Sequence, residues 1–207
     1  MPESNSDTFE DALTGYTRSM EAANYSPQTI RLRITHLRQL RRECWPLTAT
    51  RTDLEEFLAR RDLRPASRRA LRSSIRQFYR YLLDSGGRDD DPAARLPNIR
   101  EDVPVPKPAP EAVIRQALKV ADEETRLMLM LGALAGLRRA EIAGVHADHV
   151  TVEGLRVFGK GRKWRLVPLV PELRVELERV EGWAFPSSVR HGEHVTPDYV
   201  ADRIEKV

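Results

Sequence analysis

Two short motifs in the second half of the chain carry residue types suited to chemistry on a phosphodiester. The first is segment 136–141, which reads Gly-Leu-Arg-Arg-Ala-Glu after an apolar helical stretch. Gly136 lets the backbone turn, and Arg138 then begins the next helix on the same face as Glu141. A guanidinium can bind two phosphate oxygens at once, and a carboxylate can hold it in place. Taken alone, this motif is better explained as a surface ion pair.

The second motif is a basic hairpin over residues 158–169, which reads Phe-Gly-Lys-Gly-Arg-Lys-Trp-Arg-Leu-Val-Pro-Leu. Glycines on both sides of Lys160 allow a tight turn and a close approach of a phosphate backbone. A lysine ammonium at this tip can donate a proton to a leaving oxygen. Hairpin tips are also basic for solubility, so this motif alone is only moderately specific.

Positive charge gathers in the first half of the chain. Residues 22–80 hold fourteen arginines and five acidic residues, whereas residues 101–207 hold sixteen basic and seventeen acidic residues. A preference for arginine over lysine explains which basic residue is used, but not why the charge concentrates in one segment. The distribution predicts that the first half binds a polyanion.

Arginines line one face of two predicted helices in this basic segment. Leu71, Ile75, Phe78 and Leu82 form a core-facing stripe on the longer helix, and its arginines lie on the open side. A helix fits the major groove, and arginine binds phosphates and guanine edges, so these faces predict contacts with duplex DNA. Exposed faces are often charged, but they normally mix signs, whereas we expect these two to be purely positive. The predicted contacts are Arg31, Thr35, Arg38, Arg42, Arg68, Arg69, Arg72, Arg76 and Arg80.

A proline-rich stretch divides the chain. Five prolines between Leu96 and Pro110 exclude a helix and predict an extended linker over residues 97–110. The predicted domains are therefore residues 1–96 and 111–207. Turn and capping signals predict helices in the first domain over 8–23, from Ser26-Pro27 onward, after a Thr52-Asp53 cap, and over 65–83.

The second domain is predicted to mix helices with a small sheet. Short segments rich in Val, Leu and aromatic residues, separated by glycine turns, indicate a three-stranded antiparallel meander over 149–152, 155–158 and 164–169. Helical patterns occupy 110–120, 124–135, 139–145, 172–180 and 196–206. The predicted fold class is thus mainly α with a small antiparallel β-meander.

Composition excludes several other classes. Cys44 is the single cysteine, so no internal disulfide is expected. No apolar run is long enough to cross a bilayer, and the polar N-terminus is unlike a signal peptide, so we expect a cytoplasmic protein. His146 and His149 are three residues apart, as are His191 and His194. No cysteine or carboxylate cluster joins either pair, so no metal site is predicted.

In this order and about twenty residues apart, the two motifs closely resemble those of the tyrosine recombinases, the family of phage integrases and bacterial Xer proteins. Residues 159–169 fit the family's hairpin pattern, Gly-Lys-Gly-x-Lys-x-Arg-x-Val-Pro-Leu, at every fixed position, and Asp148 matches the acidic turn before it. Ser26 with Thr29, the arginine-rich helix with Phe78 and Tyr79, and segment 91–93 resemble the core-binding domain. The resemblance therefore spans nearly the whole chain.

The resemblance implies an all-helical, SAM-like core-binding domain followed by an α+β catalytic domain. It implies cofactor-free DNA strand exchange through a 3′-phosphotyrosine on duplex core attachment sites, by dimers or tetramers. By match to the motifs, Arg138 is the first catalytic arginine, Lys160 the general acid and Glu141 a supporting residue. The hairpin residues Arg162, Lys163 and Arg165 join the predicted DNA contacts.

The chain departs from the family at its C-terminal end. The His-x-x-Arg box, a later His or Trp and the nucleophilic tyrosine have no match, and Tyr199 lacks the surroundings of a nucleophile. No arm-binding domain is expected ahead of residue 8. We therefore expect a C-terminally incomplete Xer-like integrase that is inactive in cleavage as given. The alternative is a naturally truncated, non-catalytic protein that occupies recombination sites and modulates a full-length enzyme. A helix-turn-helix regulator is a weaker option, since it leaves the hairpin without a purpose.

Overall fold

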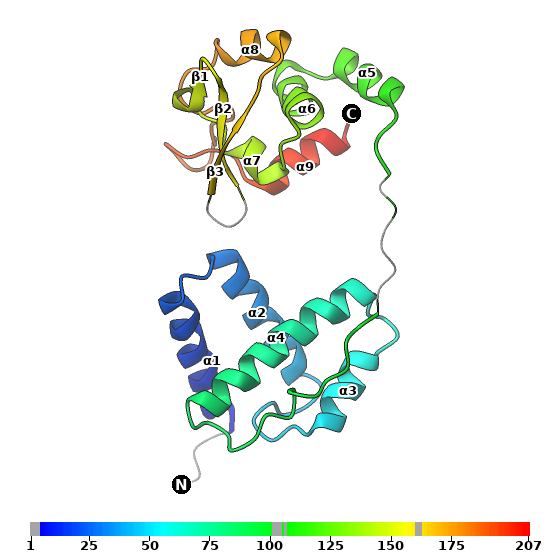
Figure 1. Cartoon of the computed structure of the whole chain (residues 1–207), viewed down its shortest axis with the longest axis vertical. Helices are drawn as coiled ribbons and strands as arrows, with labels where there is room; N and C mark the ends of the chain where they lie inside the picture. The colour runs from blue at the N-terminus through cyan, green and yellow to red at the C-terminus, as the bar shows by residue number, and fades with distance from the viewer. Residues whose placement is uncertain (1–4, 101–104, 106, 160–162) are drawn as a thin grey trace. The chain divides into compact units, whose positions relative to one another are not determined.

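The chain divides into two compact units, residues 1–105 and 106–207, in a computed structural model that describes residues 5–100, 105, 107–159 and 163–207. This division falls inside the proline-rich stretch. Each unit has its own hydrophobic core. The regular structure is mainly helical with one small antiparallel sheet (Figure 1), as the sequence predicted.

In the described part of the first unit, the regular structure is helical throughout. The long helix α4 packs against the other three helices (Figure 1). Its stripe of Leu71, Ile75, Phe78 and Leu82 is buried, as predicted. The Tyr79 hydroxyl donates a hydrogen bond to the Pro46 carbonyl at 2.7 Å, which satisfies its polar group inside the core. The elements are α1 (Asn5–Ala22), α2 (Pro27–Arg41), α3 (Arg51–Ala59) and α4 (Pro65–Asp84).

Capping residues determine where two of these helices begin. The Ser26 hydroxyl accepts a hydrogen bond from the Thr29 amide, and Pro27 is the first residue of α2, as predicted. The prediction for α3 was wrong by two residues, because Thr50 rather than Thr52 is its N-cap. Thr50 is preferred because Asp53 lies three residues later and accepts a hydrogen bond from the Thr50 amide at 2.7 Å, completing a capping box.

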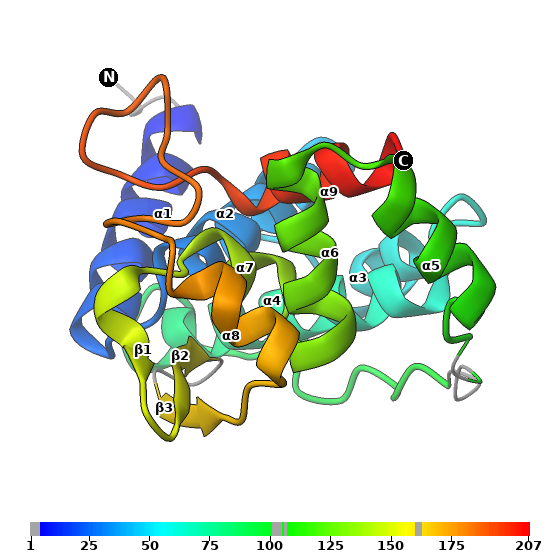
Figure 2. The ribbon, with the colours of Figure 1, turned by 90° about the horizontal axis from the view of Figure 1, so that it is seen from above.

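The second unit combines helices with a three-stranded antiparallel sheet of order β1-β2-β3, which lies at one side of the unit (Figure 1). Helix α6 is central and contacts α5, α7, α8 and α9 (Figure 2). The helices are α5 (Glu111–Val120), α6 (Glu123–Ala135), α7 (Arg139–Ala143), α8 (Pro171–Leu177) and α9 (Pro197–Glu205), and the 3-10 helix η1 covers Ala147–His149. The strands are β1 (Val150–Thr151), β2 (Gly154–Gly159) and β3 (Lys163–Val167). Their ends differ by a few residues from the predicted ones, as is usual for frayed termini.

The two sheet faces differ in burial. Leu155 and Val157 of β2 are buried, whereas Phe158 on the same strand is half exposed. Phe158 stands directly opposite Trp164 of β3, which is exposed to a similar extent. Directly opposed residues in an antiparallel pair share a face, so these two rings lie together on the exposed side of the hairpin.

No helix in the described ranges is long and apolar enough to cross a membrane.

Candidate functional site

A buried carboxylate joins the two motifs of the second unit. Gly136 ends α6 with a left-handed backbone (φ 62°), and Arg138 then caps α7. Glu141 accepts hydrogen bonds from the Arg138 amide at 2.8 Å and from its guanidinium at 3.1 Å. The Arg165 guanidinium reaches the same carboxylate from β3 with two hydrogen bonds, at 2.6 and 2.9 Å. Glu141 therefore holds Arg138 and the hairpin strand together.

The charge of this carboxylate is stabilised by its partners. The hydrogen bonds from Arg165, together with those from Arg138, outweigh the effect of burial and lower the pKa of Glu141 to about 2. The Glu141 side chain is 4% exposed, whereas that of Arg138 is 67% exposed. The anion is thus enclosed, and the Arg138 guanidinium remains accessible to a ligand.

Gly159 of β2 lies close to this ion pair. A Cβ added there would lie 2.7 Å from the Arg165 guanidinium and 3.1 Å from the Glu141 carboxylate. A side chain at this position would therefore displace the Arg165 guanidinium from its present place beside Glu141. This is a second reason for a glycine beside Lys160, in addition to the tight turn.

A cavity of about 360 Å³ opens in front of Arg138. We call it the phosphate cavity; its lining residues are Gly136, Arg138, Gly159, Lys163, Trp164 and Arg165. Lys163 and Arg138 bring positive charge to it from the two motifs, and Glu141 neutralises only part of that charge. Lys160 and Arg162, predicted as general acid and DNA contact, lie outside the described residues. The site can therefore hold an anion of the size of a phosphodiester.

Removing the charge of Glu141 should destabilise the second unit in a pH-dependent way. The folded pKa lies below the ordinary value of 4.5, so the ionised group stabilises the fold above about pH 4.5 and loses this effect as the pH falls towards about 2. Glu141→Gln should lower the free energy of unfolding by about 1–3 kcal/mol at pH 7, because both partner arginines are partly solvated. Urea unfolding at pH 7 and at pH 3 measures this.

The matched control is Glu181→Gln, which changes an exposed glutamate. The difference between wild type and Glu141→Gln should shrink at pH 3, whereas the control should follow wild type at both pH values. Equal destabilisation by Glu141→Gln at both pH values would show that its charge contributes nothing.

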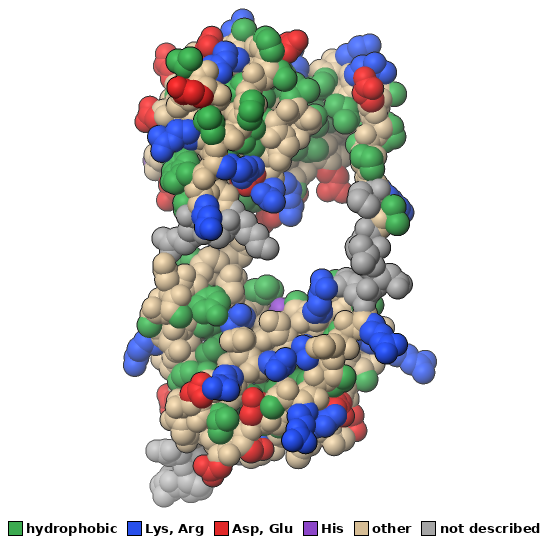
Figure 3. Space-filling view, viewed as in Figure 1, with side chains coloured by type: hydrophobic (Ala, Val, Ile, Leu, Met, Phe, Trp, Pro, Cys, Tyr) green, Lys and Arg blue, Asp and Glu red, His purple; other side chains and the backbone are tan. Residues whose placement is uncertain are grey.

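The predicted DNA contacts of the first unit lie on α2 and α4. Arg31, Arg42 and Arg76 are exposed, and none of them has an ion-pair partner among the described residues. Thr35 and Arg69 are exposed as well. Lys and Arg side chains follow the course of α4 on the face seen in Figure 3. These positions agree with a surface that binds a polyanion.

The two helix faces are not purely positive, and that expectation was wrong. Arg38 pairs with Glu10 of α1 at 3.0 Å, and Arg80 pairs with Asp84 one turn later at 3.0 Å. Both pairs are exposed, so each contributes little to stability and can be exchanged for a phosphate contact. Glu10 and Asp84 both lie outside residues 22–80, the segment whose excess of arginine led to this expectation.

Two further arginines of this set are partly buried and bind the chain itself. Arg72 donates to the Leu96 carbonyl from Nε at 3.3 Å and from Nη2 at 2.8 Å, which anchors the start of the proline-rich stretch to α4. Arg68 donates to the Arg60 carbonyl at 2.7 Å. Arg72 also lines a cavity of about 410 Å³ with Arg76 and Arg80. It therefore combines a structural role with its position in the basic surface.

Tyr199 of α9 has a structural partner in α6. Its hydroxyl donates a hydrogen bond to the Glu124 carboxylate at 3.0 Å, and burial and this carboxylate raise the pKa of Tyr199. Both effects disfavour the phenolate that nucleophilic attack requires. Tyr199 is not among the residues that line the phosphate cavity.

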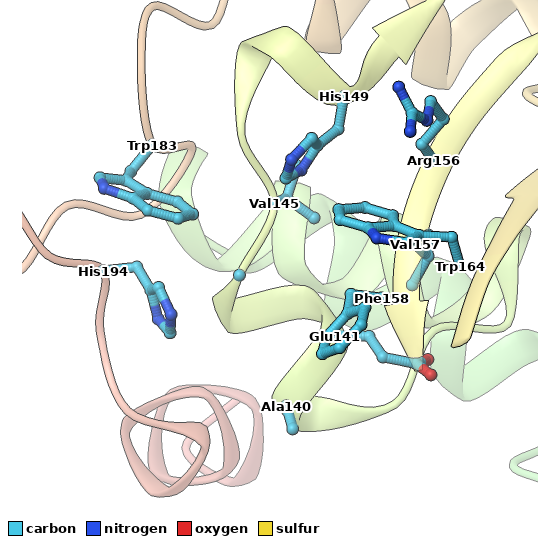
Figure 4. Close-up of a pocket in the computed structure, with 11 residues that line it drawn as sticks. Ala140, Glu141, Val145, His149, Arg156, Val157, Phe158, Trp164, Trp183 and His194 are labelled. Atoms are coloured by element: carbon cyan, nitrogen blue, oxygen red, sulfur yellow. The ribbon is translucent and has the colours of Figure 1, made fainter. Parts of the chain in front are cut away.

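Sequence reasoning missed a second cavity of about 370 Å³, which lies beside β2 and α7 (Figure 4). We call it the aromatic cavity, because His149, Phe158, Trp164, Trp183 and His194 line it together with Arg156. The alternation of β2 and β3 could have placed Phe158 and Trp164 on one face. Nothing in the local sequence indicated that Trp183 and His194 lie opposite.

Comparisons with known proteins agree on one family. The chain is 30% identical to tyrosine recombinase XerC of Chromobacterium violaceum, over 95% of this chain and 73% of that protein. It is 37% identical to tyrosine recombinase XerD of Xanthomonas axonopodis pv. citri, over 61% of this chain and 44% of that protein. No protein-family model matches.

Solved structures support the fold. A lambda integrase dimer bound to a COC′ core site superposes with a TM-score of 0.75 at 16% identity, covering 95% of this chain and 79% of that chain. A lambda integrase tetramer bound to a Holliday junction gives a TM-score of 0.74 at 18% identity, covering 98% of this chain and 66% of that chain. At this identity the likeness concerns the fold alone.

Proposed function

This chain belongs to the tyrosine recombinase family, and we propose that it acts in site-specific DNA recombination, binding duplex DNA with its first unit and a scissile phosphate with its second. The observation that carries the proposal is the Arg138–Glu141–Arg165 cluster. It leaves the Arg138 guanidinium accessible beside the glycine hairpin, in a cavity that Lys163 also lines.

Each residue of the cluster has a distinct role in this proposal. Arg138 stabilises the negative charge that builds up on the phosphate oxygens during attack. Glu141 and Arg165 are positioning residues that hold the Arg138 guanidinium and the hairpin. Lys160 donates a proton to the departing 5′-oxygen, so that the strand ends in a 5′-hydroxyl while the phosphate is bound to the nucleophilic tyrosine. In this proposal the nucleophilic tyrosine is not Tyr199.

We propose that copies of the chain assemble on DNA core sites as dimers or tetramers. The lambda integrase structures that share its fold are dimers and tetramers on DNA. The basic surface of α2 and α4 supplies the phosphate contacts of each copy, and Lys163 adds a contact from the second unit.

The chain should bind duplex DNA with an affinity that falls steeply as salt rises, because bound phosphates release counterions. Reversing the charges of Arg31 and Arg76 should weaken binding at least about tenfold and reduce the slope of log affinity against log salt by roughly two, one per lost phosphate contact. Fluorescence anisotropy of a labelled duplex over a salt series measures both quantities.

The matched control reverses Arg95 and Arg100, which are also exposed but lie at the beginning of the proline-rich stretch. This pair should change the affinity and the slope far less. Equal losses from both double variants would mean that α2 and α4 do not form the binding face.

The alternative function is a non-catalytic protein that occupies recombination sites. It is favoured by the engagement of Tyr199 with Glu124, because no described tyrosine lines the phosphate cavity. Under either function, the chain by itself should bind DNA without forming a covalent adduct. Denaturing electrophoresis after incubation with a nicked suicide duplex tests this, with Tyr199→Phe as the control. An adduct that Tyr199→Phe abolishes would place the nucleophile on α9.

A further inference from the structure

The phosphate cavity and the aromatic cavity share one wall. Trp164 lines both of them, and Arg138 lies in the first. Glu141, whose carboxylate holds Arg138, lines the second. A group bound in the aromatic cavity would therefore lie next to a phosphate bound at Arg138.

The rings around Trp164 form a continuous cluster. The centroid of Trp164 lies 4.9 Å from that of His149 and 5.3 Å from that of Phe158, and the Arg156 guanidinium lies 5.2 Å from the Trp164 ring centroid. Trp183 and His194 lie on the opposite side of the cavity, and their ring centroids are 4.8 Å apart (Figure 4). Trp164 and Phe158 nevertheless remain 49% and 50% exposed. The rings contact one another but leave large faces uncovered.

Polar groups in the cavity suit a planar ligand without positive charge. The Glu141 carboxylate is occupied by hydrogen bonds from Arg138 and Arg165, so it offers little to a cation. His194 donates a hydrogen bond from Nδ1 to the Val195 carbonyl at 2.7 Å, since a carbonyl can only accept. Burial, with His146 and Arg156, lowers the pKa of His149, which disfavours a positive charge on this imidazole.

A nucleotide joins a phosphate and a planar aromatic group through one sugar. We infer that the aromatic cavity binds a nucleobase of the nucleotide next to the phosphate held by Arg138, with Trp164 as its stacking surface. The inference rests on the proposed function. Bases inside an intact duplex are stacked on both sides, whereas strand cleavage frees one face of the base at the 5′-hydroxyl end. Aromatic side chains bind such unstacked bases, with little regard to sequence.

Charge favours DNA over a protein as the occupant of this cavity. Arg156 lies at the cavity, and Arg138, Lys163 and Arg165 lie across its shared wall. An apolar segment of a second copy would cover the exposed rings but would leave the charges of Arg156 and Lys163 uncompensated. A nucleotide can stack its base on the rings and pair its phosphate with the basic side chains.

The test uses a short duplex with a central nick that ends in a 5′-hydroxyl, and 5-iodouracil as the first base on that side. Irradiation crosslinks this base to aromatic side chains that stack on it, and mass spectrometry identifies the residue. We expect the crosslink at Trp164. Trp164→Ala should lower the affinity for the nicked duplex roughly 5- to 100-fold, the range of one base–aromatic stack, and affect the intact duplex much less. Trp164→Phe should recover most of the affinity, because it keeps a ring.

The matched control is Trp45→Phe, which changes a tryptophan of the first unit and should leave both the crosslink and the affinity unchanged. Crosslinks at aromatic residues of the first unit, or equal losses on nicked and intact duplexes, would overturn the inference while leaving DNA binding in place. A change in self-association on DNA without a crosslink would assign Trp164 to a contact between copies and overturn it too. Failure of the wild-type chain to bind either duplex would instead refute the proposed function and, with it, the inference.

Discussion

Replacing Arg138 by alanine should abolish DNA cleavage while leaving duplex binding nearly unchanged. The measurement uses a recombinase in which this chain is joined to a segment that carries a tyrosine nucleophile. Arg138 is 67% exposed and bound to Glu141 through only part of its guanidinium, so its free donors can reach phosphate oxygens. Loss of one preorganised contact to a developing oxyanion costs roughly 100- to 1000-fold in rate, and loss of a full charge should cost at least that.

The neighbouring residue provides the control for this prediction. Arg139 is also exposed, but it lies outside the phosphate cavity. Arg139→Ala should therefore keep cleavage within a few-fold of wild type. Cleavage on a suicide duplex and anisotropy on an intact duplex are measured for both variants. Equal losses of cleavage, or a loss of binding that accounts for the loss of cleavage, would remove Arg138 from the active site.

Local signals in the sequence were sufficient to predict the helical first unit and the sheet of the second. Apolar spacing identified the buried stripe from Leu71 to Leu82, and Ser26-Pro27 marked the start of α2. These features depend on residues a few positions apart, which is the range over which helical periodicity and capping act. The wrong N-cap of α3 also concerns residues that are close in sequence. Thr50 and Thr52 both precede Asp53, but only Thr50 completes a capping box with it.

Partners of charged residues could not be predicted in the same way. Arg165 was expected to contact DNA, but it binds Glu141, which lies 24 residues earlier, because the register of β3 brings it to α7. The contact of Arg165 with DNA therefore remains a prediction, for the guanidinium N–H groups that do not bind Glu141. Arg72 likewise binds a carbonyl 24 residues later. A sequence shows the charge of a residue, whereas the tertiary fold determines which partner compensates it.

The aromatic cavity shows the same limit for apolar residues. Phe158 and Trp164 face each other because the hairpin register pairs them. Trp183 and His194 reach the cavity through the loop between α8 and α9, where no periodicity applies. The cavity forms only when the whole unit is folded. Strand alternation can predict its β2–β3 side but not the side formed by the loop.

Removing the amine of Lys160 should suppress cleavage in the same joined recombinase for a different reason from the loss of Arg138. Without a proton donor, the 5′-oxygen has to depart as an alkoxide, which is a poor leaving group. General acids contribute typically about 100- to 10,000-fold, so Lys160→Ala should lose cleavage by a factor in this range. Lys163→Ala is the matched control, because Lys163 lines the phosphate cavity from the same hairpin and should affect binding more than cleavage.

A duplex with a 5′-bridging phosphorothiolate at the scissile position separates the two roles. Its phosphorus–sulfur bond breaks with release of a thiolate, which departs readily without a proton. Cleavage by Lys160→Ala should therefore return close to the wild-type rate on this substrate. Cleavage by Arg138→Ala should stay low, because negative charge still builds up on the phosphate oxygens. Rescue of both variants, or of neither, would show that Lys160 is not the proton donor and that the hairpin acts only as a phosphate clamp.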